Sequence, residues 1–193
     1  MQEKIAIYGG AFDPPHLVHE KIVKYILDNN YADKVIIAPS GEREDKKYKV
    51  NSIHRKNILD IFMKSLIGYN VEFCDYFMTA GVEDNLTAGV DRYFIHKLGF
   101  SPIQVFGTDA LASIKEWDAK KRAALIIPKI FIYRGGFDPS NYDLNGIKNY
   151  TIIDMDLGKD LANLSSTQIR NGGIYHFLNS EIADYIKKNG LYK

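Results

Sequence analysis

Six short apolar runs recur along the chain, and segments with helical periodicity separate most of them. The runs are apolar almost throughout, which is typical of parallel strands covered on both faces. They lie at Lys4–Tyr8, Lys34–Ala38, Asn70–Cys74, Ile103–Phe106, Ile130–Tyr133 and Tyr150–Asp154. Repeated strand–helix–strand units form right-handed crossovers. The pattern therefore predicts an α/β fold with a Rossmann-like, doubly wound, mainly parallel sheet and helices on both faces.

The expected helices carry apolar stripes or capping signals. They lie at His16–Asp28, Ser52–Leu66, Asp91–Leu98, Ala110–Ile114, Ala119–Leu125, Ser165–Arg170 and Ser180–Asn189, the last capped by Gly190. The last two helices would form a small C-terminal helical portion, about residues 163–193. No linker or repeat divides the chain, so we expect residues 1–193 to form a single domain.

Composition excludes several classes of protein. The formal net charge is +1, which gives no overall field for nucleic acid or an anionic membrane. The only cysteine is Cys74, so no disulfide can form within the chain. Neither a secretory signal nor a membrane span is evident, and we expect a cytoplasmic, soluble protein. The oligomeric state stays open, a homo-oligomer included.

A glycine pair and two histidines follow the first expected strand, in Gly9–His19. We expect a turn at Gly9-Gly10, then Asp13 as the helix N-cap with Pro14 at the first helical position. His16 and His19 would then lie near a helix N-terminus, where free N–H groups and the helix dipole favour phosphate. The alternative is an ordinary turn with two surface histidines. No third ligand has suitable spacing, so we expect no metal site here.

A second motif occupies Leu164–Arg170. Ser165 and Gln168 have the spacing of a capping box, and this alone could explain the motif as a helix start. Ser166 and Thr167 add hydroxyls, and Arg170 adds a fixed cation. In parallel α/β sheets, ligands bind beyond the carboxyl ends of the strands. Both motifs would therefore meet in one cleft and hold phosphate from two sides.

Two further segments are candidates for the same cleft. Gly107-Thr108-Asp109 follows a strand, so Gly107 would allow close approach of a nucleoside and Asp109 could accept hydrogen bonds from ribose. Trp117 is the only tryptophan, and a core position is an alternative to stacking on a ligand. The charged stretch Pro39–Val50 contains Lys46 and is either a solvated loop or a loop that closes over phosphate.

These residues resemble a known family. Gly9–His19 is similar to the G-G-x-F-D-P-x-H-x-G-H motif of nicotinate-nucleotide adenylyltransferases, in the HxGH nucleotidyltransferase superfamily, and Ser165–Arg170 is similar to their S-S-T-x-I-R motif. Further matches in order and spacing are Arg55, Gly107-Thr108-Asp109, Trp117, Tyr133-Arg134, Tyr185-Ile186 and Leu191-Tyr192. Val18 replaces the glycine of the first motif. In Leu86–Val90 only Thr87 fits the family pattern.

The resemblance implies that ATP and nicotinate mononucleotide react to give nicotinate adenine dinucleotide and pyrophosphate in NAD biosynthesis, with Mg²⁺ carried by ATP. It implies catalytic roles for His16, His19 and Arg170. The implied ATP contacts are Gly9, Gly10, Phe12, Lys46, Gly107, Asp109, Ser166 and Thr167. The implied mononucleotide contacts are Ala11, Thr87, Trp117 and Arg134. Nicotinamide mononucleotide, another phosphorylated acceptor, or a non-catalytic nucleotide-binding regulator are the alternatives.

Overall fold

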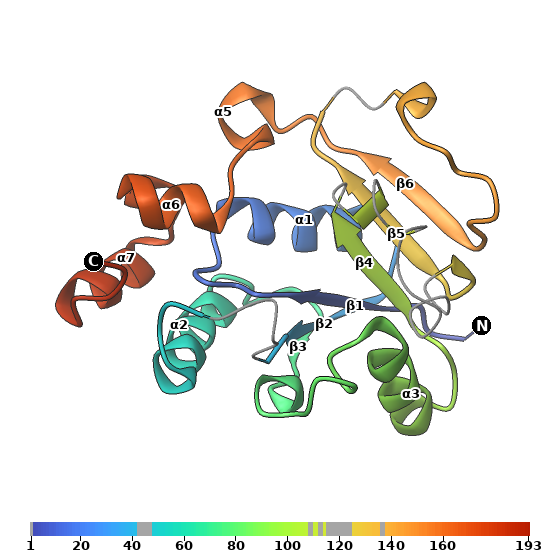
Figure 1. Cartoon of the computed structure of the whole chain (residues 1–193), viewed down its shortest axis with the longest axis horizontal. Coiled ribbons are helices and arrows are strands. Elements are labelled where there is room, and N and C mark those ends of the chain that lie inside the picture. Colours follow the sequence, from blue (N-terminus) through green and yellow to red (C-terminus); the bar gives the residue numbers. More distant parts are fainter. Residues whose placement is uncertain (1, 42–47, 108–109, 112–113, 115–124, 136–137) are drawn as a thin grey trace.

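A six-stranded parallel sheet forms the centre of the computed structural model, which describes residues 2–41, 48–107, 110–111, 114, 125–135 and 138–193 (Figure 1). The strand order is β3-β2-β1-β4-β5-β6. The strands are β1 (Ile5–Gly10), β2 (Lys34–Pro39), β3 (Val71–Phe73), β4 (Ile103–Gly107), β5 (Lys129–Tyr133) and β6 (Tyr150–Asp154). All six strands lie where the sequence predicts them, and the doubly wound α/β fold is confirmed.

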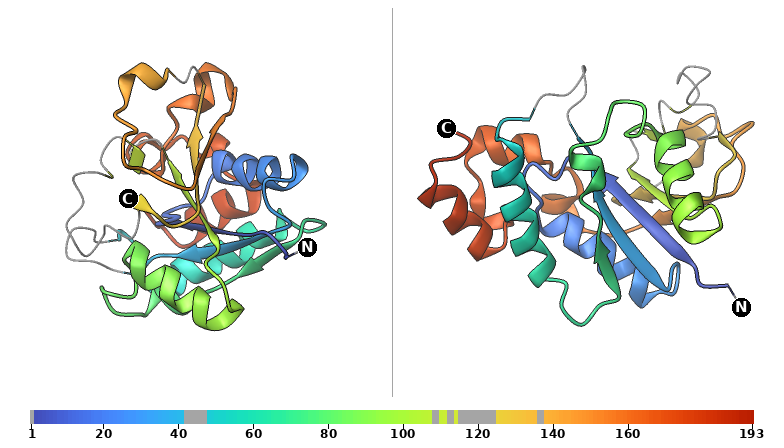
Figure 2. Two further views of the ribbon diagram at one scale, coloured as in Figure 1. Left: turned by 90° about the vertical axis from the view of Figure 1, so that its right-hand side faces the viewer. Right: turned by 90° about the horizontal axis from the view of Figure 1, so that it is seen from below.

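Helices cover both faces of the sheet, and Figure 2 shows α1 and α3 on opposite sides of it. The α-helices whose bounds lie within the described residues are α1 (Leu17–Asp28), α2 (Ser52–Lys64), α3 (Thr87–Leu98), α5 (Gly158–Ala162), α6 (Ser166–Gly172) and α7 (Ser180–Lys188). Short 3-10 turns lie at Tyr76–Met78, Pro139–Asn141 and Tyr175–Phe177. The two chain ends lie at opposite ends of the molecule, with α6 and α7 beside the C-terminus (Figure 1).

Alternation along β1 divides the core between the two faces, because successive strand side chains point to opposite sides. Ala6 and Tyr8 pack in the cluster that contains residues of α1, α2, α6 and α7. Ile5 and Ile7 pack in a second cluster with Phe94 of α3. The strand is therefore apolar throughout, and the expected C-terminal helices pack on the same core as α1.

The start of α1 differs from the expectation. His16, not Asp13, is the N-cap residue, and the first helical residue is Leu17, one position after the start of the predicted range His16–Asp28 and three after Pro14, which was expected to follow the cap. The carboxylate of Asp13 instead accepts hydrogen bonds from the main-chain N–H of Lys49 at 3.4 Å and from the Tyr192 hydroxyl at 2.6 Å. The Asp13 side chain therefore bonds to residues that are remote in sequence, rather than capping the helix as its local propensity predicted.

Gly9 and Gly10 are the other correction, because they do not form a turn. They are the last two residues of β1 and pair with Ala38 and Pro39 of β2. The chain turns at Phe12, which has a φ of 45°. The strand therefore extends two residues farther toward the carboxyl edge of the sheet than the predicted end at Tyr8.

Several helix ends also differ. The third helix begins at Thr87 rather than Asp91, α6 continues to Gly172, and α7 ends at Lys188 with Asn189 as its C-cap residue. The capping box of Ser165 and Gln168 is confirmed. Most of the predicted helix at Ala119–Leu125, and part of that at Ala110–Ile114, lie outside the described residues.

Candidate active site

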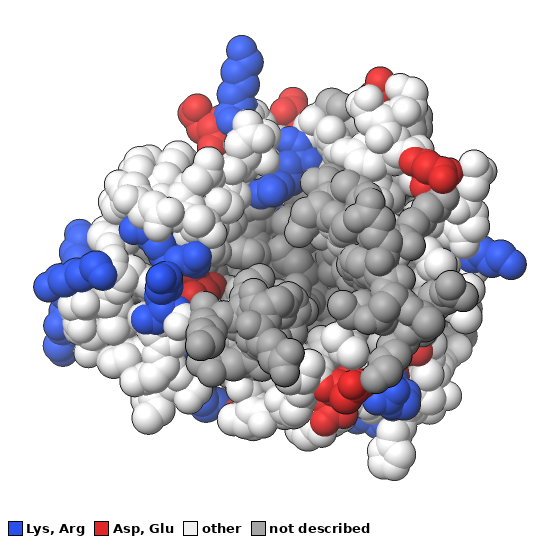
Figure 3. Space-filling view, viewed as in Figure 1, with Lys and Arg blue, Asp and Glu red and all other residues white. Residues whose placement is uncertain are grey.

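A crevice opens where β1 and β4 diverge, at the carboxyl edge of the sheet. It has two lobes, each about 430 Å³ in volume, and both are lined by Tyr8, Ala11, His19, Phe106 and Gly107. The first lobe extends between α1 and α6, and the second extends toward α3. Figure 3 shows the hollow on this face, with Lys and Arg side chains on its borders. This is the switch point at which doubly wound sheets bind ligands.

The two histidines contact each other at the start of α1. The main-chain N–H of His16 donates a hydrogen bond to Nδ1 of His19 at 3.1 Å, and the ring centroids are 3.9 Å apart. Because Nδ1 of His19 is an acceptor, the neutral ring carries its proton on Nε2. The ring of Phe12 is buried and lies 4.9 Å from that of His19. Packing and the cap together fix the direction of the Nε2–H donor.

Both histidines are neutral in the free protein. Burial, and next the charge of Arg134, lowers the pKa of His16 to about 3. Burial, followed by the charges of His16 and Arg134, holds the pKa of His19 well below its usual range. Among the described residues, Nδ1 of His16 has no hydrogen-bond partner, although the side chain is only 4% exposed. Because His16 also lines the first lobe, this buried atom is available to a ligand there.

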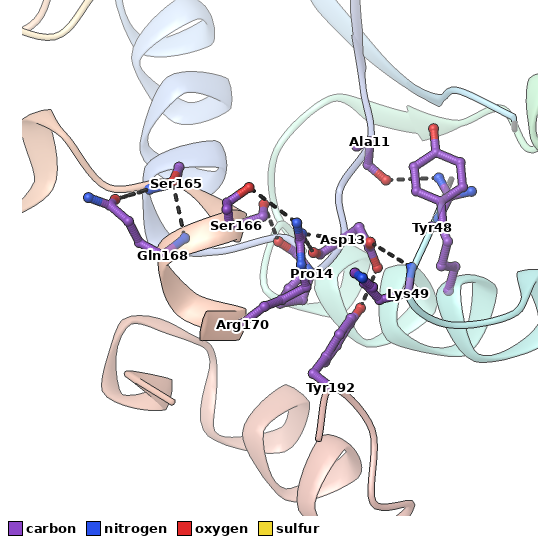
Figure 4. Close-up of polar contacts among 12 residues, drawn as sticks. Ala11, Asp13, Pro14, Tyr48, Lys49, Ser165, Ser166, Gln168, Arg170 and Tyr192 are labelled. Atoms are coloured by element: carbon purple, nitrogen blue, oxygen red, sulfur yellow. Dashed lines mark hydrogen bonds and ion pairs between the residues drawn. The ribbon is translucent and has the colours of Figure 1, made fainter. Parts of the chain in front are cut away.

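The second motif lies across the first lobe and is bonded directly to the loop between β1 and α1 (Figure 4). The hydroxyl of Ser166 donates to the main-chain oxygen of Pro14 at 2.9 Å. The guanidinium of Arg170 donates to the main-chain oxygen of Asp13, and its other branch donates to Oγ1 of Thr167 at 3.1 Å. The two motifs, about 150 residues apart in sequence, therefore form one rigid wall.

Two arginines bring positive charge to the first lobe. Arg170 lines it from α6, and Arg134 lines it from the end of β5. Nη1 of Arg134 donates to the main-chain oxygen of Leu164 at 2.7 Å, which joins β5 to the start of the second motif. Guanidinium groups bind phosphate through paired N–H donors. This lobe therefore offers two fixed cations and two neutral imidazoles to an anion.

Arg55 of α2 binds two main-chain segments beside the crevice. Its side chain is 2% exposed, and it donates to the main-chain oxygens of Ala11 and Ser40, both at 2.8 Å. The ring of Tyr48 covers the guanidinium at 3.6 Å and also lines the first lobe. The arginine thus ties the end of β1 to the segment after β2.

The second lobe contains polar residues that the sequence did not single out. Gln104 of β4 is buried and donates to the main-chain oxygen of Thr87 at 3.1 Å. Asn85 is also buried and accepts a hydrogen bond from the N–H of Gly41 at 2.8 Å. Gln104 interrupts an otherwise apolar strand, which was the one signal in sequence that pointed to it.

Comparison with known proteins agrees with this geometry. A cytidylyltransferase-like family model matches residues 7–172. A probable nicotinate-nucleotide adenylyltransferase of Fusobacterium nucleatum is 32% identical over 176 residues, which cover 87% of this chain and 86% of that protein. The chain belongs to the nicotinate-nucleotide adenylyltransferase family. A Neisseria meningitidis member is 25% identical over 202 residues, covering 99% of both chains.

Solved structures support the fold. The Plasmodium falciparum nicotinic acid mononucleotide adenylyltransferase complexed with NaAD has a TM-score of 0.84 at 22% identity, over 99% of this chain and 98% of that one. The same enzyme complexed with APC has a TM-score of 0.80. These likenesses extend over the helices at the C-terminus as well as the sheet.

Most family-motif residues that the sequence singled out line the crevice. The first lobe contains Ala11, Phe12, His16, His19, Gly107, Arg134, Ser166, Thr167 and Arg170, and the second contains Gly9, Gly10 and Thr87. Lys46, Asp109 and Trp117 lie outside the described residues. Val18, in place of the family glycine, is 2% exposed and packs in the core while lining the first lobe.

The remaining surveys concern the described part of the chain alone. It contains no group of three or more His, Cys, Asp or Glu side chains arranged to hold a metal ion. No helix in those same residues is long and apolar enough to cross a membrane.

Proposed function

We propose that this protein transfers the adenylyl group of ATP to nicotinate mononucleotide, giving nicotinate adenine dinucleotide and pyrophosphate. One observation carries the proposal: the histidine motif and the Ser165–Arg170 motif line the same lobe and are bonded to each other. The name of the Fusobacterium nucleatum relative supports the same reaction. The lobe presents donors from both sides, as a triphosphate requires.

The reaction needs positioning more than acid–base chemistry. The phosphate of the mononucleotide is already anionic, so it attacks the α-phosphorus in line without a strong base. A new bond forms between that phosphate oxygen and the α-phosphorus, and the bond to the β-phosphate oxygen breaks as pyrophosphate leaves. Orientation in a site can supply roughly 7–11 kcal/mol of the barrier. The rigid wall of the first lobe is suited to this task.

Each charged or polar group then has a proposed role. Nε2–H of His19 donates to the α-phosphoryl group, and His16 donates to the triphosphate. Arg170 stabilises the charge that develops on the leaving pyrophosphate. The hydroxyl of Ser166 already donates its hydrogen bond to the main-chain oxygen of Pro14. The hydroxyl of Thr167 is therefore the better donor to ATP. Arg134 lies in the phosphate lobe, and we assign it to the phosphate of the mononucleotide.

The other contacts follow the same division. ATP is proposed to contact the ends of β1 and β4, at Gly9, Gly10 and Gly107, and the side chains of Phe12, Lys46 and Asp109. The pyridine end is proposed to lie in the second lobe near Ala11 and Thr87, with Trp117 stacked on its ring. Because the described residues offer no carboxylate cluster, Mg²⁺ would be held mainly by phosphate oxygens and water.

A pyrophosphate-release assay tests the proposal. The purified protein is incubated with ATP, Mg²⁺ and one acceptor at a time: nicotinate mononucleotide, nicotinamide mononucleotide or phosphopantetheine. We expect the highest kcat/KM with nicotinate mononucleotide. A higher kcat/KM with either of the other acceptors would show that this acceptor, and not nicotinate mononucleotide, is the preferred substrate. Tight ATP binding with no turnover on any acceptor would refute the proposed activity and favour a nucleotide-binding regulator.

A further inference from the structure

The C-terminal segment reaches into the active-site wall through one tyrosine. The hydroxyl of Tyr192 donates a hydrogen bond to Oδ1 of Asp13 at 2.6 Å, across 179 residues of sequence (Figure 4). Asp13 lies in the loop between β1 and α1, three positions before His16. The last turn of the chain is therefore bonded to the loop that presents the histidine pair.

The carboxylate of Asp13 is buried and has several partners. Its side chain belongs to a residue that is 3% exposed, and the main-chain N–H of Lys49 lies 3.4 Å from Oδ2. The guanidinium of Arg170 lies 3.7 Å from Oδ2, while it donates to the main-chain oxygen of Asp13. A buried carboxylate requires such partners, because an unpaired buried charge is very unfavourable. Arg170, which forms this ion pair, is the same group that lines the phosphate lobe.

Tyr192 is itself held in place. The N–H of Leu191 donates to the main-chain oxygen of Ile186 at 3.0 Å, and that of Gly190 donates to Lys187 at 3.2 Å. The tyrosine has a φ of 60°, and its ring packs against the main core. Burial and the neighbouring carboxylate raise the pKa of the Tyr192 hydroxyl, so it remains a protonated donor. It is a fixed donor, not a side chain that happens to lie nearby.

We propose that Tyr192 is a positioning residue, which acts through Asp13 to keep Arg170 available for phosphate. The inference rests on the proposed adenylyl transfer. A carboxylate forms its strongest pairs with a guanidinium through two parallel hydrogen bonds. If the Tyr192 hydroxyl is removed, Oδ1 loses its donor and the carboxylate turns toward the guanidinium. That pair then competes with the triphosphate for the same N–H groups.

The variant Tyr192→Phe tests this, because it removes the hydroxyl and keeps the ring. We expect kcat/KM for ATP to fall about tenfold, as for loss of one hydrogen bond to a charged group. The KM for the mononucleotide should change less than about twofold. Tyr185→Phe is the matched control: it removes another hydroxyl of the same segment, bonded to His54 and Asn57 at 2.9 and 2.8 Å and not to Asp13. Kinetics equal to those of the control would overturn the proposal.

Asp13→Asn completes a double-mutant cycle and probes the contact from the other side. Without the carboxylate there is nothing to capture Arg170, so adding Tyr192→Phe to Asp13→Asn should lower kcat/KM for ATP by less than about twofold. A full tenfold further loss would overturn the proposal. If Tyr192→Phe is too unstable to assay, Asp13→Asn is measured alone: because it has no carboxylate to capture Arg170, its kcat/KM for ATP should stay within about threefold of wild type, and a loss of about tenfold would overturn the proposal.

Calorimetry with a non-hydrolysable ATP analogue separates this inference from the proposed function. Absence of turnover in the wild-type protein would refute the proposed reaction without testing the role of Tyr192. The Kd for the analogue would still be expected to rise about tenfold in Tyr192→Phe and to stay unchanged in Tyr185→Phe. Equal Kd values in the two variants would overturn the role of Tyr192 whatever the reaction is.

Discussion

The main-chain N–H of His16 donates to Nδ1 of His19 at 3.1 Å, so the second histidine caps the helix that presents it. One ring nitrogen therefore has a structural task and the other is free to face a ligand in the crevice. The cap also sets the tautomer, because an acceptor Nδ1 leaves the proton on Nε2. The two nitrogens can be tested separately.

The variant His19→Asn removes the Nε2–H donor and keeps an acceptor near the position of Nδ1. We expect kcat/KM to fall by at least about 30-fold, or ~2 kcal/mol, because a preorganised donor to the transition state is lost. The free energy of unfolding should stay within about 0.5 kcal/mol of wild type, because the cap remains. Steady-state kinetics and urea denaturation measure the two effects.

His19→Gln is the reciprocal control, because its amide donor reaches toward Nε2 and the cap acceptor is lost. It should retain more activity than His19→Asn and lose about 1 kcal/mol of stability. The same loss of activity in both variants, with no difference in stability, would contradict the division of tasks between the two nitrogens.

Stability should depend on pH through the buried histidines. The folded-state pKa of His16 is about 3 and its ordinary value is 6.5, so between these values the unfolded chain binds more protons than the folded chain. The free energy of unfolding therefore falls as the pH is lowered from 6.5, by up to about 1.4 kcal/mol per pH unit for His16. His19 adds to the same trend. Urea denaturation at pH 7, 6 and 5 measures the slope.

The source of that slope is identified by substitution. His16→Asn keeps an N-cap residue and should flatten the dependence, whereas His96→Asn changes an exposed residue of α3 and should leave it unchanged. An unchanged slope in His16→Asn would show that His16 is already protonated in the folded protein at pH 5.

Arg55 is expected to act on stability rather than on substrate. Arg55→Leu leaves the oxygen of Ala11 without its donor, while the oxygen of Ser40 keeps the Tyr48 hydroxyl at 3.1 Å. The free energy of unfolding should fall by about 2–4 kcal/mol, from the unpaired carbonyl and the lost packing on Tyr48. Arg92→Leu, at an exposed position of α3, is the control and should change it by less than about 0.5 kcal/mol. Equal values for both variants would refute the structural role of Arg55.

The sequence was informative where one local pattern decides the outcome. All six strands were predicted because each is a short apolar run between helical segments. The meeting of the Gly9–His19 and Ser165–Arg170 motifs followed from a general property of parallel sheets, whose strands all end at one edge. Both the fold and the proximity of the two motifs could therefore be derived from the sequence.

Contacts between remote residues could not be derived in this way. Asp13 has the propensity of an N-cap, yet Lys49 and Tyr192 take its carboxylate from 36 and 179 positions away. No motif marks Asn85, and Gln104 stands out only as a polar residue in an apolar strand; each side chain pairs with a main-chain group of another segment. Such residues are set by tertiary hydrogen bonds, on which local sequence carries no information.

Gly89 is expected to control the second lobe through the start of α3. A Cβ at this position would lie 2.2 Å from the main-chain oxygen of Glu83 and 2.7 Å from Cα of Asp84, so one of the two segments must move. Gly89→Ala should lower the free energy of unfolding by about 1–3 kcal/mol, as overpacking does. Because Thr87 lies at the start of the same helix and lines the second lobe, the KM for nicotinate mononucleotide should rise at least about fivefold, with a smaller change for ATP. Gly81→Ala is the matched control, since nothing lies within 4 Å of the added Cβ. An equal rise of both KM values in Gly89→Ala would contradict the assignment of the pyridine end to the second lobe.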